Sequence, residues 1–238
     1  MNIGAVITAR STSHRYPRKH LGILGGKPMI EQIIIKLERL SGLNHIILST
    51  TDNPADDELC KVAAAAGAEI NRGPEHNLLE RDFLAIDSYN LDIIIPISGD
   101  CPFVSNNCCQ FLIDTVRDLP NWDDYDSIGG FATFTAAWGF VPGMNTARSY
   151  EKYIPLMKKY KDKYSYEQYW LSGKEEPELF KAYTIDTSGF LAPEITPMKM
   201  SIDWRLENLI WNVVIDYLGY YPEEIEDFNK AFGGIETL

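Results

Sequence analysis

The 238-residue chain is poor in the residues that build disulfide frameworks, metal centres and nucleic-acid surfaces. It has four cysteines without a C-x-x-C pair, and its four histidines lack the spacing of zinc ligands. The 22 basic residues are outnumbered by 34 acidic residues, which leaves a net charge of −12. A general nucleic-acid binder needs a basic face to neutralise phosphates, so this composition argues against that class.

Long apolar runs are absent as well. No stretch approaches the ~20 apolar residues of a membrane span, and the N-terminus lacks the basic and then apolar design of a signal peptide. We therefore expect a cytoplasmic protein with reduced thiols and no membrane partner. With 45% hydrophobic residues the chain can bury a sizeable core, and its length suits a single domain over residues 1–238.

Apolar strands alternate with helical patterns along the first half of the chain. Four strands are predicted over residues 2–8, 45–50, 68–70 and 92–97, with helices over residues 28–40, 56–66 and 77–89. This order predicts a three-layer α/β/α fold with a mostly parallel central sheet, and ligands then bind at the carboxyl ends of the strands. Pro96 in the most apolar strand predicts a bulge, because proline cannot donate to the ladder.

The first strand ends in a polar loop, residues 9–20, with four Arg/Lys side chains and three Ser/Thr hydroxyl groups. Cations, hydroxyls and backbone N–H groups gathered beyond a strand can bind a polyphosphate. The loop matches neither the Walker A pattern nor G-x-G-x-x-G. A solvated surface loop is the alternative interpretation.

The residues of this loop form a recognisable pattern, Ala9-Arg10-x-x-Ser13-x-Arg15-x-Pro17-x-Lys19-x-Leu21 followed by Gly25-Gly26-Lys27-Pro28. The pattern resembles the nucleotide loop of sugar cytidylyltransferases, above all the branch of spore coat polysaccharide biosynthesis protein F, which is related to enzymes that make CMP-activated acidic sugars. The family usually carries glycine where Thr12 and Arg18 stand. Close approach of the backbone to a triphosphate is therefore less assured here.

The resemblance implies a nucleotide-diphospho-sugar transferase-like (Rossmann-like) fold and a nucleotidyltransferase that uses CTP and Mg²⁺. An oxygen of a sugar, expected to be an acidic sugar, would attack the α-phosphorus of CTP and expel pyrophosphate, in the biosynthesis of a surface polysaccharide. Residues 1–120 would form the nucleotide-binding half, residues 121–200 an acceptor and dimerisation part, and residues 201–238 C-terminal helices.

Two aspartates follow segments that are predicted as strands. Asp100 stands in Gly99-Asp100-Cys101-Pro102 after the most apolar strand, and Asp203 ends an alternating segment over residues 199–204. Mg²⁺ takes one or two carboxylates and completes its shell with water and phosphate. Each aspartate could instead cap the helix that follows it. The first motif resembles the metal corner of the family and Asp203 its second metal carboxylate, which implies a Mg²⁺ site made by both.

The expected site residues come from several segments. We expect a catalytic role for Lys19, Arg15, Asp100 and Asp203, and contact with the nucleotide from Ala9, Arg10, Ser13, Arg15, Lys19, Thr50, Arg81, Ser98 and Asp100. Thr50 could instead belong to a plain polar turn after the second strand. Arg81 could instead be a surface cation paired with a neighbouring carboxylate.

The second half of the chain predicts fewer contacts with the nucleotide. Strands are expected over residues 126–131 and 179–185, and residues 150–170 read as a helix rich in Tyr whose rings we expect to be buried in a homodimer contact. Residues 139–145 faintly resemble the sugar-side segment of the family. Asn145 and Thr146 stand where the family more often has an acidic pair, so the acceptor sugar stays open.

Two other functions remain compatible with the residues. A glycosyltransferase would consume a nucleotide sugar, although no D-x-D motif follows a central strand. A nucleotide-binding homologue without catalysis is the second, and Thr12 and Arg18 are the observations that favour it.

Overall fold

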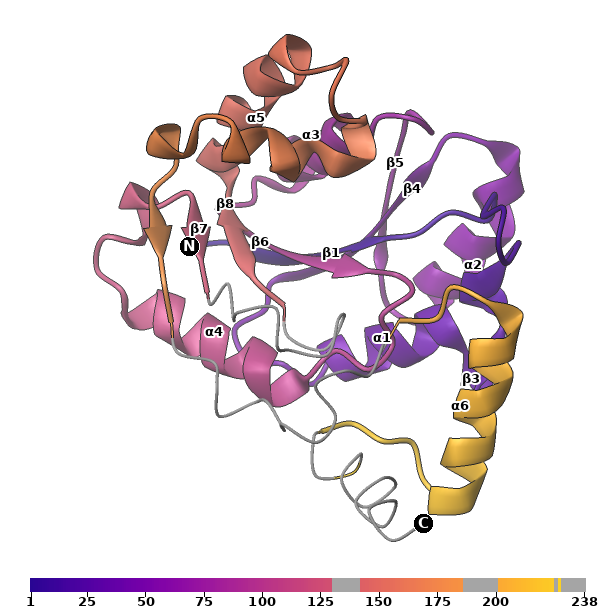
Figure 1. Ribbon diagram of the computed structural model, residues 1–238. Coiled ribbons are helices and arrows are strands. Elements are labelled where there is room, and N and C mark those ends of the chain that lie inside the picture. The colour runs from indigo at the N-terminus through magenta and orange to yellow at the C-terminus, as the bar shows by residue number, and fades with distance from the viewer. Residues whose placement is uncertain (130–141, 186–200, 225–226, 228–238) are drawn as a thin grey trace, which may run out of the picture.

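The computed structural model describes residues 1–129, 142–185, 201–224 and 227. Its main sheet has the strand order β5-β4-β1-β6-β8-β7-β9 (Figure 1). The strands are β1 Ile3–Thr8, β4 His45–Thr51, β5 Glu69–Gly73, β6 Ile93–Ser98, β7 Ser127–Ile128, β8 Met144–Thr146 and β9 Ala182–Tyr183. The α-helices are α1 Met29–Leu37, α2 Asp57–Ala65, α3 Leu78–Tyr89, α4 Asn106–Asp118, α5 Ala147–Lys159 and α6 Arg205–Leu218.

The four strands expected in the first half are all present, and each pairs in parallel with its neighbour in the order β5-β4-β1-β6. β8 joins β6 in antiparallel orientation, and β7 pairs with both β8 and β9. The prediction of a mostly parallel central sheet is confirmed.

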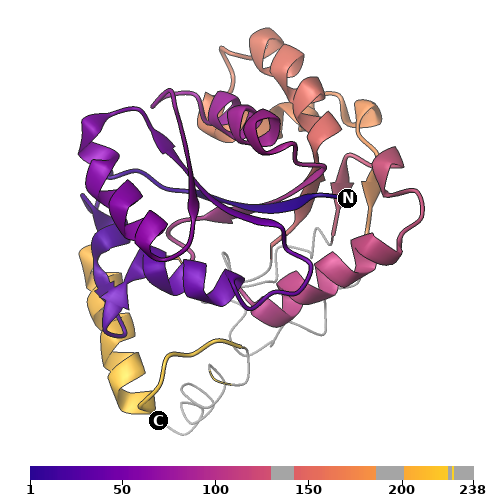
Figure 2. The same ribbon diagram turned by 180° about the vertical axis from the view of Figure 1, so that it is seen from behind.

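Helices cover the two faces of this sheet as separate layers (Figures 1 and 2). Alternation along β6 shows the division, since Ile93 and Ile95 pack into the core with α1, α2 and α4 while Ile94 packs into the core with α3 and α5. A strand that is apolar on both sides needs cover on both sides, which is why β1, β4 and β6 read as continuous apolar runs. The three-layer α/β/α prediction is confirmed.

Pro96 lies in β6 without a bulge, so that expectation was wrong. The register of β6 on β1 runs without a break from Ile3↔Ile93 through Val6↔Pro96 to Thr8↔Ser98. The N–H groups of Ile93 and Gly99 donate to the β1 side. Position 96 is out of phase with both, so its missing N–H belongs to the side of β8, which pairs with β6 only at Ile93 and Ile94. The proline therefore removes no ladder bond.

A short hairpin between the basic loop and α1 went unpredicted. β2 (Ile23–Leu24) and β3 (Lys27–Pro28) pair in antiparallel orientation across Gly25 and Gly26, whose φ angles are 57° and 84°. Two consecutive positive φ angles are what a two-residue hairpin turn requires, and glycine adopts them without strain. The backbone N–H of Gly25 donates to Asn212 of α6 at 3.0 Å, so the hairpin also seats the C-terminal helix.

Several elements of the second half are shorter than expected. The helix predicted over residues 150–170 is α5, followed by a separate 3₁₀ segment, η4 (Tyr166–Lys174). Of the two strands predicted there, only two residues each are paired, in β7 and β9, and residues 130–131 lie outside the described part. Residues 201–204 form no strand, which corrects the prediction for 199–204, whose first two residues also lie outside it.

The aromatic rings of the second half pack against their own chain. Tyr150 and Tyr169 are buried, and both contact Tyr153, which stacks on Phe180 at 4.8 Å between ring centroids. Only Tyr166 and Trp170 remain largely exposed among the aromatic residues of η4. The reason given for a dimer contact at residues 150–170 is therefore removed, although dimerisation itself stays a prediction. No helix in the described ranges is long and apolar enough to cross a membrane.

Candidate active site

A cavity of about 360 Å³ opens at the carboxyl ends of β1 and β6, within the size range of small-molecule sites. It is lined by Thr8, Ala9, Arg10, Ser13, His14, Arg15, Lys19, His20, Leu78, Arg81, Ser98, Asp100 and Glu167. All but one of the residues expected to contact the nucleotide are in this set. The exception is Thr50, which is fully buried on β4.

The parallel register of β1 and β6 brings the basic loop and Asp100 together. Thr8 and Ser98 are paired at the ends of the two strands, and Gly99 then donates to the carbonyl of Thr8 at 2.9 Å. A Cβ at position 99 would lie 2.8 Å from the Cβ of Ala9 and 2.9 Å from that carbonyl oxygen. Glycine is therefore required where the two chain segments turn toward the cavity.

The loop is anchored from below by a carboxylate that sequence reasoning missed. Asp56 is fully buried, accepts from the backbone N–H of Ser11 at 2.6 Å and also bonds the hydroxyl of Thr51 at the end of β4. Burial alone would raise the pKa of Asp56, but the hydrogen bonds from Thr51 and Ser11 lower it overall. An Asp just after a strand and a turn was the available signal.

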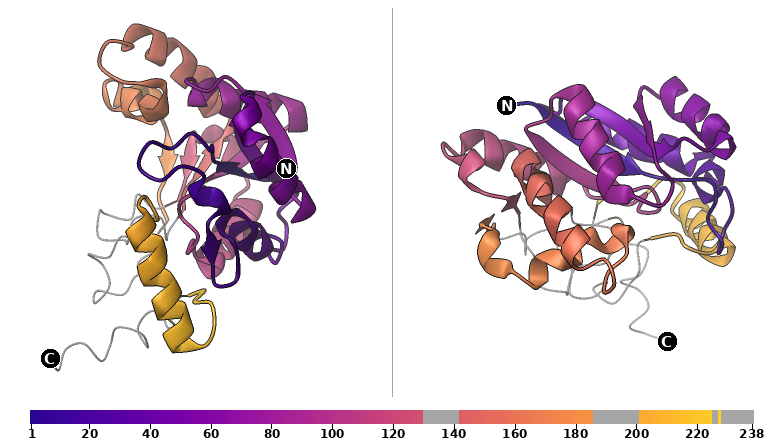
Figure 3. Two further views of the ribbon diagram at one scale, coloured as in Figure 1. Left: turned by 90° about the vertical axis from the view of Figure 1, so that its right-hand side faces the viewer. Right: turned by 90° about the horizontal axis from the view of Figure 1, so that it is seen from above.

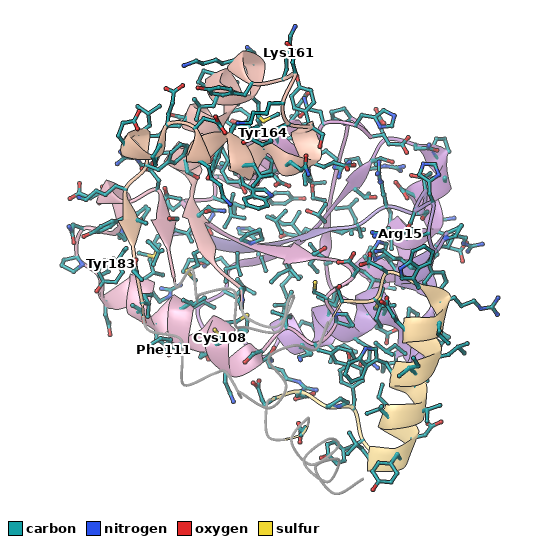
Figure 4. All side chains as sticks on the ribbon, in the orientation of Figure 1. Arg15, Cys108, Phe111, Lys161, Tyr164 and Tyr183 are labelled. Carbon is teal, nitrogen blue, oxygen red and sulfur yellow. The ribbon has the colours of Figure 1, made fainter. Side chains whose placement is uncertain are left out.

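Two carboxylates converge on the ammonium group of Lys19. Nζ lies 2.6 Å from Oδ2 of Asp100 and 3.3 Å from Oδ1 of Asp203, and the lysine is only 5% exposed. The guanidinium of Arg15 donates to the same Oδ1 of Asp203 at 2.6 Å. Figure 4 shows Arg15 on the loop beside the first turn of α6. The four residues expected to be catalytic therefore form one ion cluster.

Asp203 reaches the cluster through a loop contact rather than from a strand. The backbone N–H of Ile202 donates to the carbonyl of Asp100 at 2.7 Å, which sets residue 203 beside the end of β6. The helix that follows is capped at Trp204, and the side chain of Glu207 accepts from the N–H groups of Asp203 and Trp204. The carboxylate of Asp203 is thus directed to the cations, and the alternative of a helix cap is wrong.

Electrostatics keep the cluster ionised. Burial alone would raise the pKa of Asp100, but the Lys19 charge and the hydrogen bonds from Lys19 and Ser98 lower it overall. The neighbouring His20 was not predicted as a site residue. Burial, helped by the charge of Lys19, lowers the pKa of His20 to about 4, and its Nδ1 lies 2.8 Å from the carbonyl oxygen of Gly99. A neutral imidazole at neutral pH therefore supports the turn that carries Asp100.

Two arginines form the opposite wall of the cavity. Arg81 is buried and donates to the carbonyls of Pro74 and Glu75 at 3.2 and 3.0 Å, so its interpretation as a surface cation is wrong. Arg10 donates to Glu167 at 2.8 Å. Glu167 comes from η4, so the second half of the chain contributes to the site at a residue that sequence reasoning missed.

The two departures from the glycine pattern of the family have different structural roles. The hydroxyl of Thr12 donates to Glu75 at 2.7 Å, which ties the loop to the segment after β5. Arg18 has φ 57° and ψ 26°, in the left-handed region that favours glycine, and its guanidinium pairs with exposed Glu58. A glycine requirement therefore exists at position 18, and the chain meets it with arginine.

The donor set fits a magnesium ion shared with a substrate. Within the described ranges, no group of three or more His, Cys, Asp or Glu side chains is placed to hold a metal. Asp100 and Asp203 nevertheless lie within reach of one point, the ammonium of Lys19. Mg²⁺ is usually bound by one or two carboxylates together with waters and substrate phosphates.

The sheet order, the cationic loop after β1 and the carboxylate after β6 define a nucleotidyltransferase of the α/β class. The sequence profile of the cytidylyltransferase family matches residues 5–188, and the chain belongs to this family of enzymes. It is 29% identical to an uncharacterized protein of Methanocaldococcus jannaschii, over 97% of this chain and 95% of that protein.

Two further similarities agree with this assignment. The 3-deoxy-manno-octulosonate cytidylyltransferase of Maricaulis maris is 32% identical over 51% of this chain and 47% of its own length. The chain thus aligns with about half the length of that enzyme. The solved structure of a cytidylyltransferase from Leptospira borgpetersenii superposes with a TM-score of 0.80 at 21% identity, covering 100% of this chain and 96% of the other. At that identity the likeness shows the shared fold.

Proposed function

We propose that the protein uses CTP and Mg²⁺ to convert an acidic sugar into a CMP-sugar with release of pyrophosphate. The observation that carries the proposal is the ion cluster in which Asp100 and Asp203 hold Lys19 at the wall of the cavity. Cations and carboxylates that neutralise one another there can exchange partners when a magnesium triphosphate enters. The site is thus charged for its ligand while the free protein remains neutralised locally.

The chemistry asks little covalent work of the protein. An oxygen of the sugar forms a bond to the α-phosphorus of CTP, the bond from this phosphorus to the bridging oxygen breaks, and pyrophosphate leaves. Arg15 and Lys19 would stabilise the charge that develops on the phosphate oxygens. Arg10 and Ser13 would hold the triphosphate at the loop. Positioning and electrostatics carry most of such a transfer, so no dedicated base is needed.

The two aspartates would hold the metal ion. Asp100 and Asp203 are ionised and aimed at one point, and Mg²⁺ bound there bridges phosphate oxygens and neutralises their charge. Lys19 and Arg15, released from the two carboxylates, would then face the phosphates.

The acceptor follows from the relatives and from the arginines of the cavity. The Maricaulis maris enzyme is named for 3-deoxy-manno-octulosonate, a sugar acid. Arg10 and Arg81 on the far wall of the cavity could pair with a sugar carboxylate as readily as with phosphate. We propose an acidic sugar of this kind, used for a surface polysaccharide, in a protein that works in the cytoplasm.

Pyrophosphate release from each of the four nucleoside triphosphates, with 3-deoxy-manno-octulosonate and other sugar acids as acceptors, tests the proposal. Turnover should require CTP, the acceptor and Mg²⁺, and should stop with a chelator. Thermal shift with the same nucleotides measures binding separately, because a selective ligand raises the melting temperature. CTP binding without turnover on any acceptor would favour a homologue that has lost catalysis. Turnover only with a nucleotide sugar would favour a glycosyltransferase.

A further inference from the structure

Helix α6 has an apolar face that the rest of the described chain leaves uncovered. Its inner face is anchored, since Trp211 packs on Phe103 at 4.4 Å between ring centroids and Asn212 bonds the β2–β3 hairpin. On the opposite face a stripe of five side chains is between 52% and 81% exposed: Leu206, Leu209, Ile210, Val213 and Tyr217. Figure 3 shows α6 at the outside of the molecule.

The spacing of these residues makes the stripe continuous. Positions separated by three, four, seven and eleven residues lie on one side of an α-helix, and the stripe extends about 16 Å along the axis. Large exposed side chains scattered singly need no explanation, but a continuous face of this kind indicates a binding surface. Trp204 and Ile23 of β2 are also about half exposed and adjoin the two sides of the helix.

We propose that this stripe binds the same stripe of a second copy of the chain, with the two α6 helices antiparallel across a two-fold axis. Charge supports the choice of partner. Two copies that each carry a net charge of −12 repel one another, so their contact must lie where neither presents an acidic side chain. The stripe contains no charged residue.

The charges beside the stripe are complementary under the same symmetry. Arg205 and Asp216 are exposed on the same flank of α6, at opposite ends of the stripe. The midpoint between them nearly coincides with the centre of the stripe, and each lies about 8 Å from it along the helix. In an antiparallel pair the same flanks face each other, so Arg205 would meet Asp216 of the partner subunit, and the contact forms twice.

A lipid surface is a poorer occupant for this face. Helices that lie on membranes carry several Lys or Arg side chains beside the apolar face, which are attracted to anionic lipids. α6 contains one basic residue, Arg205, in a chain that is strongly acidic overall. A second copy of the chain suits the observed charges better.

Sedimentation velocity over a series from nanomolar to high micromolar protein tests the pairing. We expect a monomer–dimer equilibrium, and Val213→Glu should weaken it at least ~10²-fold, because like charges then face each other across the axis. Trp170→Glu is the matched control, since Trp170 is a comparably exposed ring on η4, away from α6. A monomer throughout the series would overturn the proposal, as would a dimer that only Trp170→Glu dissociates.

Charge reversal tests the antiparallel geometry. Arg205→Asp and Asp216→Arg should each weaken the dimer, and the double variant should regain wild-type affinity because every contact is restored with the signs exchanged. A double variant as weak as the sum of the single variants would overturn the proposal. Circular dichroism confirms that each variant is folded. Since the readout is mass, it is independent of whether cytidylyl transfer is observed.

Discussion

The nucleotide-binding half and the region of residues 142–185 use charged side chains in opposite ways. In the first half, Lys19 and Arg81 are buried and directed to one cavity, where Asp203 joins them. In residues 142–185, ion pairs such as Lys163–Glu175 lie at the surface, while the rings are packed inside. Surface pairs contribute little to stability, whereas buried charges are costly unless they serve a purpose. Burial of charge therefore marks the functional half.

The largest effect should come from the two aspartates of the ion cluster. Asp100→Asn, Asp203→Asn and the double variant should each lose ~10³-fold or more in turnover, because a lost metal site removes several kcal/mol of transition-state stabilisation. The losses should be similar rather than additive, since the ligands act as a unit. Steady-state kinetics over a Mg²⁺ series provides the measurement.

The matched control is Asp123→Asn, an exposed carboxylate in the second half. Wild-type activity of a folded Asp203→Asn variant at low Mg²⁺ would contradict the metal role of Asp203 and restrict that residue to pairing with Arg15.

Lys19→Ala should cost ~10²-fold in turnover because it removes a charge that meets the triphosphate. It also leaves the carboxylates of Asp100 and Asp203 facing each other without their shared cation, so the variant should be less stable than the wild type. Added Mg²⁺ should recover part of that stability even without nucleotide, which differential scanning calorimetry can detect. Lys27→Ala is the control, because Lys27 is exposed and pairs with Glu31 on the neighbouring helix. Near-normal kinetics of Lys19→Ala would exclude the proposed role.

The parts of the site that were predictable are those in which function follows a strand end locally. The apolar runs of β1 and β6 are each followed by polar residues, so the order of residues alone places the loop and Asp100 at one edge of the sheet. Asp203 depends on the contact of Ile202 with Asp100, a bond between distant segments that no local pattern encodes. His20 and Glu167 were missed for the same reason.

Short elements were the other source of error. β7 and β9 are two residues long and exist because neighbouring strands pair with them, so their apolar runs predicted longer strands. The glycine pair at positions 25 and 26 did signal a hairpin, but it was interpreted only as a stop before α1. The aromatic residues of α5 and η4 were correctly expected to be buried, yet nothing in their spacing distinguishes an internal core from a contact between subunits.

Asp82 connects the two regions and should make stability depend on pH. Burial raises the pKa of Asp82 to about 7, against the opposing hydrogen bond from Tyr169 and the charge of Arg81. The unfolded side chain titrates near ~3.9, so between these values the native state binds more protons than the unfolded state. Stability should then fall as pH rises through this window, by about 2 kcal/mol between pH 5 and 7, and level off above it.

Thermal melts of wild type and Asp82→Asn across that range measure the effect. The variant should show a flatter profile and exceed the wild type in stability above neutral pH. Asp87→Asn, an exposed aspartate on the same helix, should retain the wild-type slope. Equal slopes for wild type and Asp82→Asn would show that Asp82 has an ordinary pKa.

The smallest effect concerns backbone strain in the basic loop, at Arg18. A non-glycine residue in the left-handed region costs ~1–2 kcal/mol, and glycine relieves this cost while adding flexibility to the unfolded chain. Arg18→Ala keeps the strained conformation and loses only the exposed pair with Glu58, which is worth little. Arg18→Gly should therefore be more stable than Arg18→Ala by about 1 kcal/mol in urea unfolding. Since Arg18 does not line the cavity, both variants should keep CTP turnover. If the alanine variant is the more stable of the two, the loop carries no strain at this position, and arginine replaces the glycine of the family without cost.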